Sequence, residues 1–125
     1  MRLQESGEMY LETILVLSKQ KGMVHAIDVG RELGYTRPSV SRAMGILKKA
    51  GYITIGETGN IVLTASGKAI AERIYERHVV LTSLLKHFGV EDKTAAEDAC
   101  KMEHDISDTS LKAMKKYLKE NNILS

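Results

Sequence analysis

The chain has 125 residues, of which 43% are hydrophobic and 27% are charged, and it contains one cysteine. This composition is typical of a globular protein with one or two small domains, and it argues against disordered, collagen-like and low-complexity classes. One cysteine cannot form an internal disulfide, so we expect a cytoplasmic protein in a reducing environment. The longest aliphatic runs are far shorter than a membrane span, and the polar start of the chain does not resemble a signal peptide.

The net charge of +2 is unevenly distributed along the chain. Residues 19–68 carry eight Lys and Arg against three Asp and Glu, a net charge of +5, whereas residues 1–18 carry −2 and the remainder −1. A basic segment of this kind attracts a polyanion such as DNA. An excess of this size is also common on ordinary solvated surfaces, so the charge alone does not decide the partner.

Hydrophobic periodicity and capping residues predict a mainly α-helical chain with one small hairpin. Apolar residues recur at helical spacing in the longer segments, alternate with polar ones over residues 52–55, and form a short continuous run at 61–63. Helix starts are indicated by Thr36 with Pro38 in the following turn, by Thr94 with Glu97, and by Ser107. The expected elements are helices over about 6–19, 27–33, 36–50, 64–88, 94–105 and 107–120, and strands over 52–55 and 61–63.

The order of helix, glycine turn, helix and hairpin in the first half is typical of a winged helix-turn-helix. A DNA-reading helix needs small or hydrogen-bonding side chains at its N-terminus, where its free N–H groups also attract phosphate. An arginine at such a position can contact guanine, and hydroxyl groups can anchor phosphates. The alternatives are a simple helix cap with solvated arginines, or a winged helix that binds protein. The predicted DNA-binding residues are Thr36, Arg37, Pro38, Ser39, Ser41, Arg42, Lys48, Thr58 and Asn60.

A second group of residues has the chemistry of a metal site. Cys100, Glu103 and His104 are spaced i, i+3 and i+4, which predicts that they project from one face of a helix. Thiolate, carboxylate and imidazole are all ligands of first-row transition metals. Each residue also has an ordinary structural interpretation, as a small apolar group, an ion-pair partner or a hydrogen-bonded core residue. The predicted metal ligands are Met9, Glu12, His78, Cys100, Glu103 and His104.

Several motifs together resemble one family. They are Glu8-Met9-Tyr10-Leu11-Glu12, Thr36-Arg37-Pro38-Ser39-Val40-Ser41, Leu63-Thr64-Ala65-Ser66-Gly67, Arg77-His78, and the segment 98–108 around Cys100-Lys101-Met102-Glu103-His104. In this order they are similar to the diphtheria toxin repressor family of metal-dependent transcriptional repressors, which includes the manganese transport regulators.

The resemblance implies a homodimer with two domains. A winged helix-turn-helix would occupy about residues 1–70, and a helical domain for dimerisation and metal binding would occupy about residues 71–125. Longer members of the family add an SH3-like domain, so the resemblance implies a short two-domain form or a truncated chain. It also implies operator DNA as the partner and a role in controlling metal-homeostasis genes.

The resemblance further implies that Fe²⁺ or Mn²⁺ acts as co-repressor. Met9, Cys100, Glu103 and His104 match the iron-type primary site, whereas Glu12 and His78 match positions that complete a two-metal site in manganese-type members. Those members carry Asp and Glu where this chain has Met9 and Cys100. Thr82 and Ala96 replace a carboxylate and an imidazole of the iron-type ancillary site.

The donor set indicates the expected metal, and two other functional classes stay open. Sulfur donors favour Fe²⁺ over Mn²⁺, and Co²⁺, Ni²⁺ and Zn²⁺ should also bind in vitro. The chain could instead be a winged-helix regulator that senses a small organic ligand, or one that senses thiol oxidation at Cys100. We do not expect an enzyme, because Cys100 and His104 lack an orienting third group.

Overall fold

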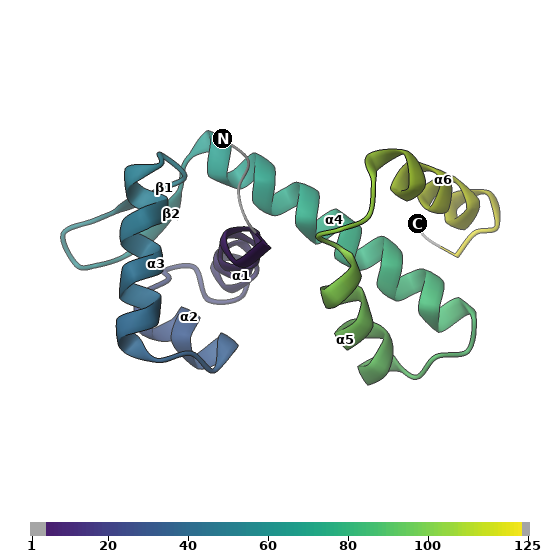
Figure 1. Ribbon diagram of the computed structural model, residues 1–125, viewed down its shortest axis with the longest axis horizontal. Helices are drawn as coiled ribbons and strands as arrows, with labels where there is room; N and C mark the ends of the chain where they lie inside the picture. The colour runs from purple at the N-terminus through teal and green to yellow at the C-terminus, as the bar shows by residue number, and fades with distance from the viewer. Residues whose placement is uncertain (1–4, 124–125) are drawn as a thin grey trace. The chain divides into compact units, whose positions relative to one another are not determined.

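The computed structural model describes residues 5–123 and confirms the predicted fold class, a mainly α-helical chain with an N-terminal helix-turn-helix, a small wing and a helical C-terminal part. It divides into two compact units, Met1–Glu72 and Arg73–Ser125. Among the described residues, no helix is both long and apolar enough to cross a membrane. The elements, labelled in Figure 1, are α1 (Glu5–Lys21), α2 (Ala26–Leu33), α3 (Arg37–Lys49), β1 (Ile53–Ile55), β2 (Ile61–Leu63), α4 (Ala65–His87), α5 (Asp92–Met102) and α6 (Asp108–Glu120).

Helix α1 supplies the centre of the first unit. Acidic residues lie in its first turn and basic residues in its last turn, where each sign suits the helix dipole. Leu11, Ile14 and Leu15 are almost fully buried. The helix extends by one or two residues beyond its predicted limits at each end, so Ser6 lies inside the first turn and does not cap it.

The turn between α2 and α3 has the expected chemistry. Gly34 ends α2 in the left-handed region at a φ of 71°, which glycine adopts without strain. Thr36 caps α3, because its Oγ1 accepts a hydrogen bond from the Ser39 N–H at 3.4 Å.

At the start of α2, the Lys21 ammonium donates to Asp28 Oδ1 at 2.6 Å, and the His25 N–H donates to Oδ2 at 2.8 Å. These two hydrogen bonds lower the pKa of Asp28 and stabilise the α2 N-terminus.

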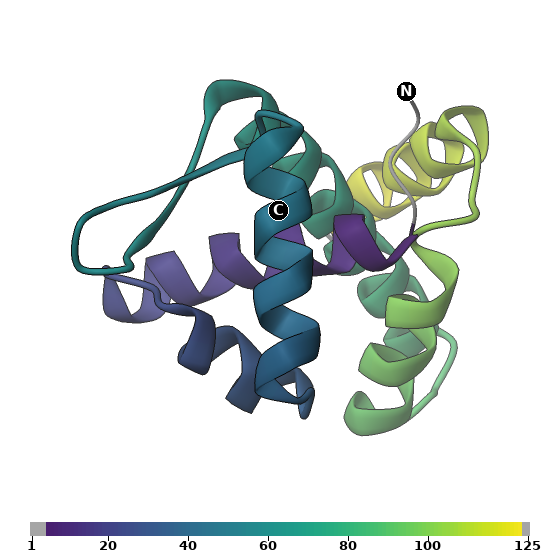
Figure 2. The ribbon, with the colours of Figure 1, turned by 60° about the vertical axis from the view of Figure 1, so that its left-hand side comes forward.

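The wing is a two-stranded antiparallel hairpin. The predicted hairpin is present, and in it Ile53 pairs with Leu63, Thr54 with Val62 and Ile55 with Ile61. The hairpin is fixed to the rest of the unit by a further bridge between Val24 and Ile61. Figure 2 shows α1 passing behind α3, with the hairpin extending to one side.

The first unit has one continuous apolar core. It contains side chains from α1, α2, α3, both strands and the start of α4. Residues 65–72 of α4 belong to this unit, and Ala71 is fully buried within it. Gly67 is required there, since a Cβ atom at that position would lie 2.0 Å from the carbonyl oxygen of Tyr52.

The second unit is built from the rest of α4 with α5 and α6. Its core contains Val80, Leu111 and Leu118. Ser107 caps α6 as predicted, since its Oγ accepts from the Ser110 N–H at 3.1 Å. The predicted start of α5 is wrong: the helix begins at Asp92 and Thr94 lies within its first turn, because Glu91 and not Thr94 occupies the N-cap.

Candidate metal centre and nucleic-acid interface

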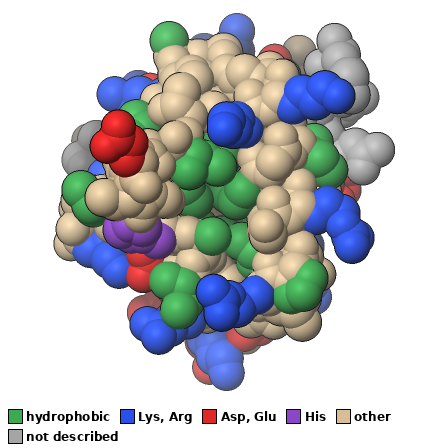
Figure 3. Space-filling view, turned by 90° about the vertical axis from the view of Figure 1, so that its left-hand side faces the viewer, with side chains coloured by type: hydrophobic (Ala, Val, Ile, Leu, Met, Phe, Trp, Pro, Cys, Tyr) green, Lys and Arg blue, Asp and Glu red, His purple; other side chains and the backbone are tan. Residues whose placement is uncertain are grey.

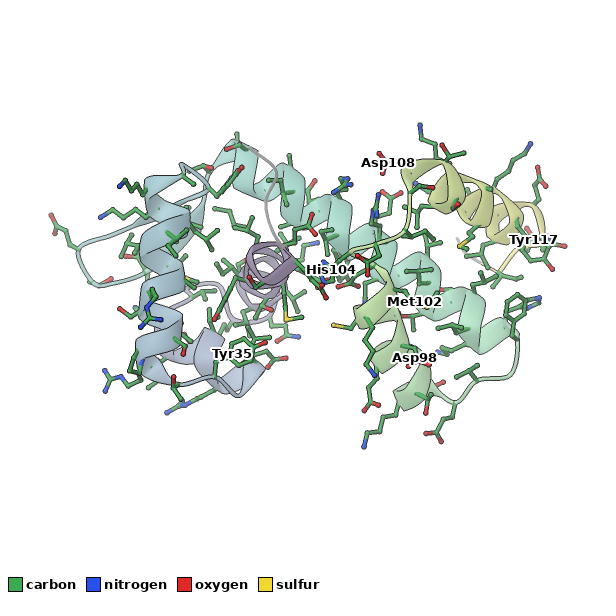
Figure 4. All side chains as sticks on the ribbon, in the orientation of Figure 1. Tyr35, Asp98, Met102, His104, Asp108 and Tyr117 are labelled. Atoms are coloured by element: carbon green, nitrogen blue, oxygen red, sulfur yellow. The ribbon has the colours of Figure 1, made fainter. Side chains whose placement is uncertain are left out.

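The predicted metal ligands of the second unit lie on α4, on α5 and on the turn after α5. The expected arrangement of Cys100, Glu103 and His104 on one helix needs a correction, because α5 ends at Met102. Glu103 is the C-cap residue and its N–H still donates to the carbonyl of Ala99 at 2.9 Å. His104 follows in the connection to α6, and Figure 4 labels His104 there and Asp108 at the start of α6.

A buried carboxylate lies at the centre of this group. The Glu103 side chain has no exposed surface, and its Oε2 lies 2.9 Å from Nδ1 of His78. Its other oxygen, Oε1, lies 3.5 Å from Nε2 of His104, whose side chain is also buried. Oε1 has no hydrogen bond from the described residues. A charged oxygen in that position is costly unless a cation compensates it.

This donor set fits a divalent cation. A carboxylate with two imidazoles is a ligand combination found for Mn²⁺, Fe²⁺ and Zn²⁺. The half-buried thiol of Cys100 lies one helical turn before Glu103 on the chain. The second unit therefore brings together three of the predicted ligands, His78, Glu103 and His104.

Met9 and Glu12, the two remaining predicted ligands, lie on α1 in the first unit, where both are half-buried. The Met9 sulfur has a structural contact there, since it accepts a weak hydrogen bond from the Tyr35 hydroxyl at 3.7 Å. The Tyr35 ring in turn packs edge-on against Tyr10, with their centroids 5.9 Å apart.

Arg77 organises the segment that carries Glu103 and His104. Its side chain is 2% exposed, and its Nη1 donates to the carbonyl oxygens of Glu103, at 3.1 Å, and of Ile106. Its Nη2 forms an ion pair with Asp108 at the start of α6. This hydrogen bond, together with the charge of Arg73, lowers the pKa of the Asp108 carboxyl. One guanidinium thus connects α4 to the C-cap of α5, to the segment that follows it, and to the first residue of α6.

Arg77 was not identified as a site residue from the sequence. Nothing in the sequence pattern distinguishes a buried arginine from a solvated one, because arginine is usually exposed. The partners of Arg77 are mostly backbone carbonyls, which carry no sequence signature.

The predicted DNA-binding residues all belong to the first unit, seven of them on α3 and its N-cap and two at the wing tip. Val40, Met44 and Leu47 form the buried side of α3, which leaves the rest of the helix surface exposed. Figure 3 shows this face, with Lys and Arg side chains around an apolar hollow. A hollow between α2 and α3 is lined by Arg31, Tyr35 and Arg37, among others. The exposed predicted residues of the cap and of α3 are Thr36, Arg37, Pro38, Ser39, Ser41, Arg42 and Lys48.

The wing tip is held closed by its own hydrogen bonds. The Thr58 hydroxyl donates to Asn60 Oδ1 at 3.0 Å, and the Gly56 N–H donates to the Asn60 carbonyl at 2.9 Å. Thr58 is exposed and Asn60 half-buried, so Thr58 is the better placed of the two for an external contact.

Comparison with known proteins agrees with both halves of this description. The family model for the iron dependent repressor N-terminal DNA binding domain matches residues 2–59. The model for the iron dependent repressor metal binding and dimerisation domain matches residues 64–122. Both describe a transcriptional regulator, which confirms the prediction that the chain is not an enzyme.

Individual relatives give the same result. The transcriptional regulator MntR of Escherichia coli O6:H1 is 30% identical over 112 residues, which are 90% of this chain and 72% of the relative. The crystal structure of IdeR from T. acidophilum matches with a TM-score of 0.82 and 25% identity, over 95% of this chain and 56% of that one. A manganese-dependent transcriptional repressor in complex with manganese has the same fold, with a TM-score of 0.83 and 22% identity over 90% of this chain and 52% of that one.

The chain spans little more than half the length of these two solved structures. The matched family models nevertheless include nearly all of its own residues, with the DNA-binding part first and the metal-binding part second. The protein therefore belongs to the iron-dependent repressor family of transcriptional regulators.

Proposed function

We propose that this protein is a metal-dependent transcriptional repressor that binds operator DNA as a homodimer. The observation that carries the proposal is the buried carboxylate of Glu103 between the imidazoles of His78 and His104. That arrangement lies in the part matched to a metal-binding and dimerisation domain. The exposed, basic surface of α3 supports the DNA-binding half of the proposal.

The proposed ligand set also includes Met9, Glu12 and Cys100, because these residues match the family motifs in the sequence. A bound divalent cation would supply a common coordination centre for donors from α1 and from the second unit. Met9 and Glu12 would then hold α1 in one position, and with it the adjacent α3. Arg77 would keep the Glu103 backbone in place while the side chain binds.

We propose Fe²⁺ as the preferred ion, with Mn²⁺ as the alternative. Sulfur donors from Met9 and Cys100 favour the softer Fe²⁺, and the Irving–Williams order also places Fe²⁺ above Mn²⁺. Several similar structures are described by manganese: the manganese regulator SloR, the manganese-activated repressor ScaR, and a manganese-dependent transcriptional repressor in complex with manganese. Competition between the two ions for the purified protein, under anaerobic conditions, decides between them.

The test begins with selection of binding sites from a random pool of duplex DNA, with Fe²⁺ or Mn²⁺ and with a chelator. The selected duplex is then titrated by fluorescence anisotropy. We expect metal to tighten binding about 5- to 150-fold, the range of a typical coupling of about 1–3 kcal/mol between two sites. Equal affinity with either ion and with chelator would refute the metal dependence.

Matched variants localise the effect. His78→Ala removes a proposed ligand, whereas His87→Ala removes an exposed histidine from the end of the same helix. We expect the first variant to lose the metal response and the second to keep it. A peroxide response at Cys100 in metal-free protein, without any metal response, would favour the thiol sensor instead.

A further inference from the structure

Gly45 occupies a position in α3 that the fold itself does not explain. It lies inside the helix, on the exposed side, with a backbone conformation open to any residue. A Cβ atom added there would meet nothing within 4 Å. Glycine in a helix interior destabilises it relative to alanine, so the absence of a side chain needs a reason outside the folded chain.

The neighbours of Gly45 indicate what that reason is. Ser41 and Arg42 lie one turn before it, and Lys48 and Lys49 one turn after it, all exposed. Gly45 is thus central to the surface of α3 predicted to face DNA. Glycine is the residue that permits the closest approach of a backbone to a ligand.

Ile46 is the second anomaly on the same surface. Its side chain is 61% exposed, more than any other large apolar side chain described in the first unit. It lies one turn after Arg42 and one turn before Lys49. A single exposed isoleucine is unremarkable on most surfaces, but here it interrupts a row of cations on the helix predicted to read base edges.

We propose that Gly45 and Ile46 determine sequence specificity: Gly45 lets α3 lie deep in the major groove, and Ile46 contacts the C5-methyl group of a thymine. This methyl group is the apolar feature that the major groove presents, and aliphatic side chains are its usual partners. The arginine and hydroxyl groups of α3 cannot supply this contact. The inference rests on the proposed function, because it assumes that α3 binds duplex DNA.

The methyl contact is tested by removing either partner. The full-length protein, with saturating Mn²⁺, first selects a duplex from a random pool, and each thymine in that duplex is then replaced by uracil. At one position we expect affinity to fall about fourfold, which corresponds to about 0.8 kcal/mol for one buried methyl group. In Ile46→Ala the same replacement should have no effect, whereas Ile27→Ala, which truncates a 49% exposed isoleucine on α2, should retain the fourfold response.

Gly45→Ala tests the close approach of α3 to DNA, because the substitution should stabilise the folded protein and weaken its binding to DNA. The added methyl group should raise the thermal unfolding midpoint by a few degrees, because alanine is the better helix former. It should also weaken binding to the selected duplex about fivefold or more, as expected when one base contact is lost. A purely structural role for Gly45 predicts lower stability and does not predict this combination.

The outcomes distinguish a failure of the proposed function from a failure of this inference alone. If the wild-type protein selects no sequence, both the proposed function and this inference are wrong. If it selects a sequence, but each uracil replacement changes the affinity of Ile46→Ala as much as that of the wild type, only the methyl contact is wrong. If Gly45→Ala binds the duplex as tightly as the wild type, the close approach at Gly45 is refuted.

Discussion

Arg77→Met removes the guanidinium that connects α4 to the segment between α5 and α6. Methionine retains much of the buried stem but has no donor for the carbonyl oxygens of Glu103 and Ile106, which accept from Nη1. The ion pair with Asp108 is also lost, although that carboxylate is 67% exposed and solvent screens it. The variant thus tests how much one buried arginine stabilises the second unit.

The expected loss follows from these contacts. Each carbonyl left without a donor destabilises by about 1–3 kcal/mol, with Ile106 toward the lower end because it is only half-buried. Removal of a desolvated guanidinium offsets part of this loss, since burying a charge is itself unfavourable. We therefore expect the free energy of unfolding to fall by about 2–4 kcal/mol.

The assay is urea denaturation of metal-free protein, followed by far-ultraviolet circular dichroism. Hydrogen exchange resolved to peptides reports separately on residues 103–108. Arg73→Met is the matched control, because Arg73 is 49% exposed and lies 3.7 Å from the same Asp108 carboxylate. Arg77→Lys should recover only part of the loss, since one ammonium cannot reproduce the fork of a guanidinium.

If Arg77→Met unfolded at the same urea concentration as the wild type, and hydrogen exchange in residues 103–108 were unchanged, the stabilising role of the Arg77 hydrogen bonds would be refuted. Equal losses in Arg77→Met and Arg73→Met would show that surface charge, and not the buried hydrogen bonds, is responsible. Metal affinity provides a further measurement: we expect it to fall in Arg77→Met even at temperatures where the variant is fully folded, because the Glu103 backbone is no longer held.

Three further predictions follow from packing and charge. Gly67→Ala should destabilise the chain by about 1–3 kcal/mol, because the new Cβ would lie 2.0 Å from the Tyr52 carbonyl oxygen; a thermal midpoint at or above that of the wild type would contradict this. Leu118→Ala should lower the free energy of unfolding by about 2–5 kcal/mol, since Leu118 is fully buried, and a loss below about 1 kcal/mol in urea denaturation would exclude its core role. Arg77 lowers the pKa of Asp108, so their ion pair stabilises the fold above the ordinary carboxyl pKa of 3.8 and this stabilisation is lost as the pH falls through the lower pKa of the folded state. In Asp108→Asn the free energy of unfolding should therefore decrease less steeply at acid pH than in the wild type. An unchanged decrease would contradict this prediction.

Local sequence features determined most of the secondary structure of this protein. Thr36 and Ser107 cap their helices as predicted, because an N-cap needs only a side-chain oxygen and the N–H groups that follow it. The wing forms the predicted two-stranded hairpin, since the strand-forming residues and the turn between them are both local features. The sequence also singled out Glu103 and His104 as candidate metal ligands by their residue types.

Only the tertiary structure decided which of these residues meet. The distance of 2.9 Å between His78 Nδ1 and Glu103 Oε2 joins α4 to the C-cap of α5, a contact that spacing along one helix cannot predict. The burial of Arg77 and the exposure of Ile46 reverse what their residue types favour. Periodicity reports which face of an element is apolar, but it carries no information about what covers that face or about contacts made through backbone carbonyls. The sequence therefore determined the elements and the chemistry available to them, and long-range packing determined the environment in which that chemistry acts.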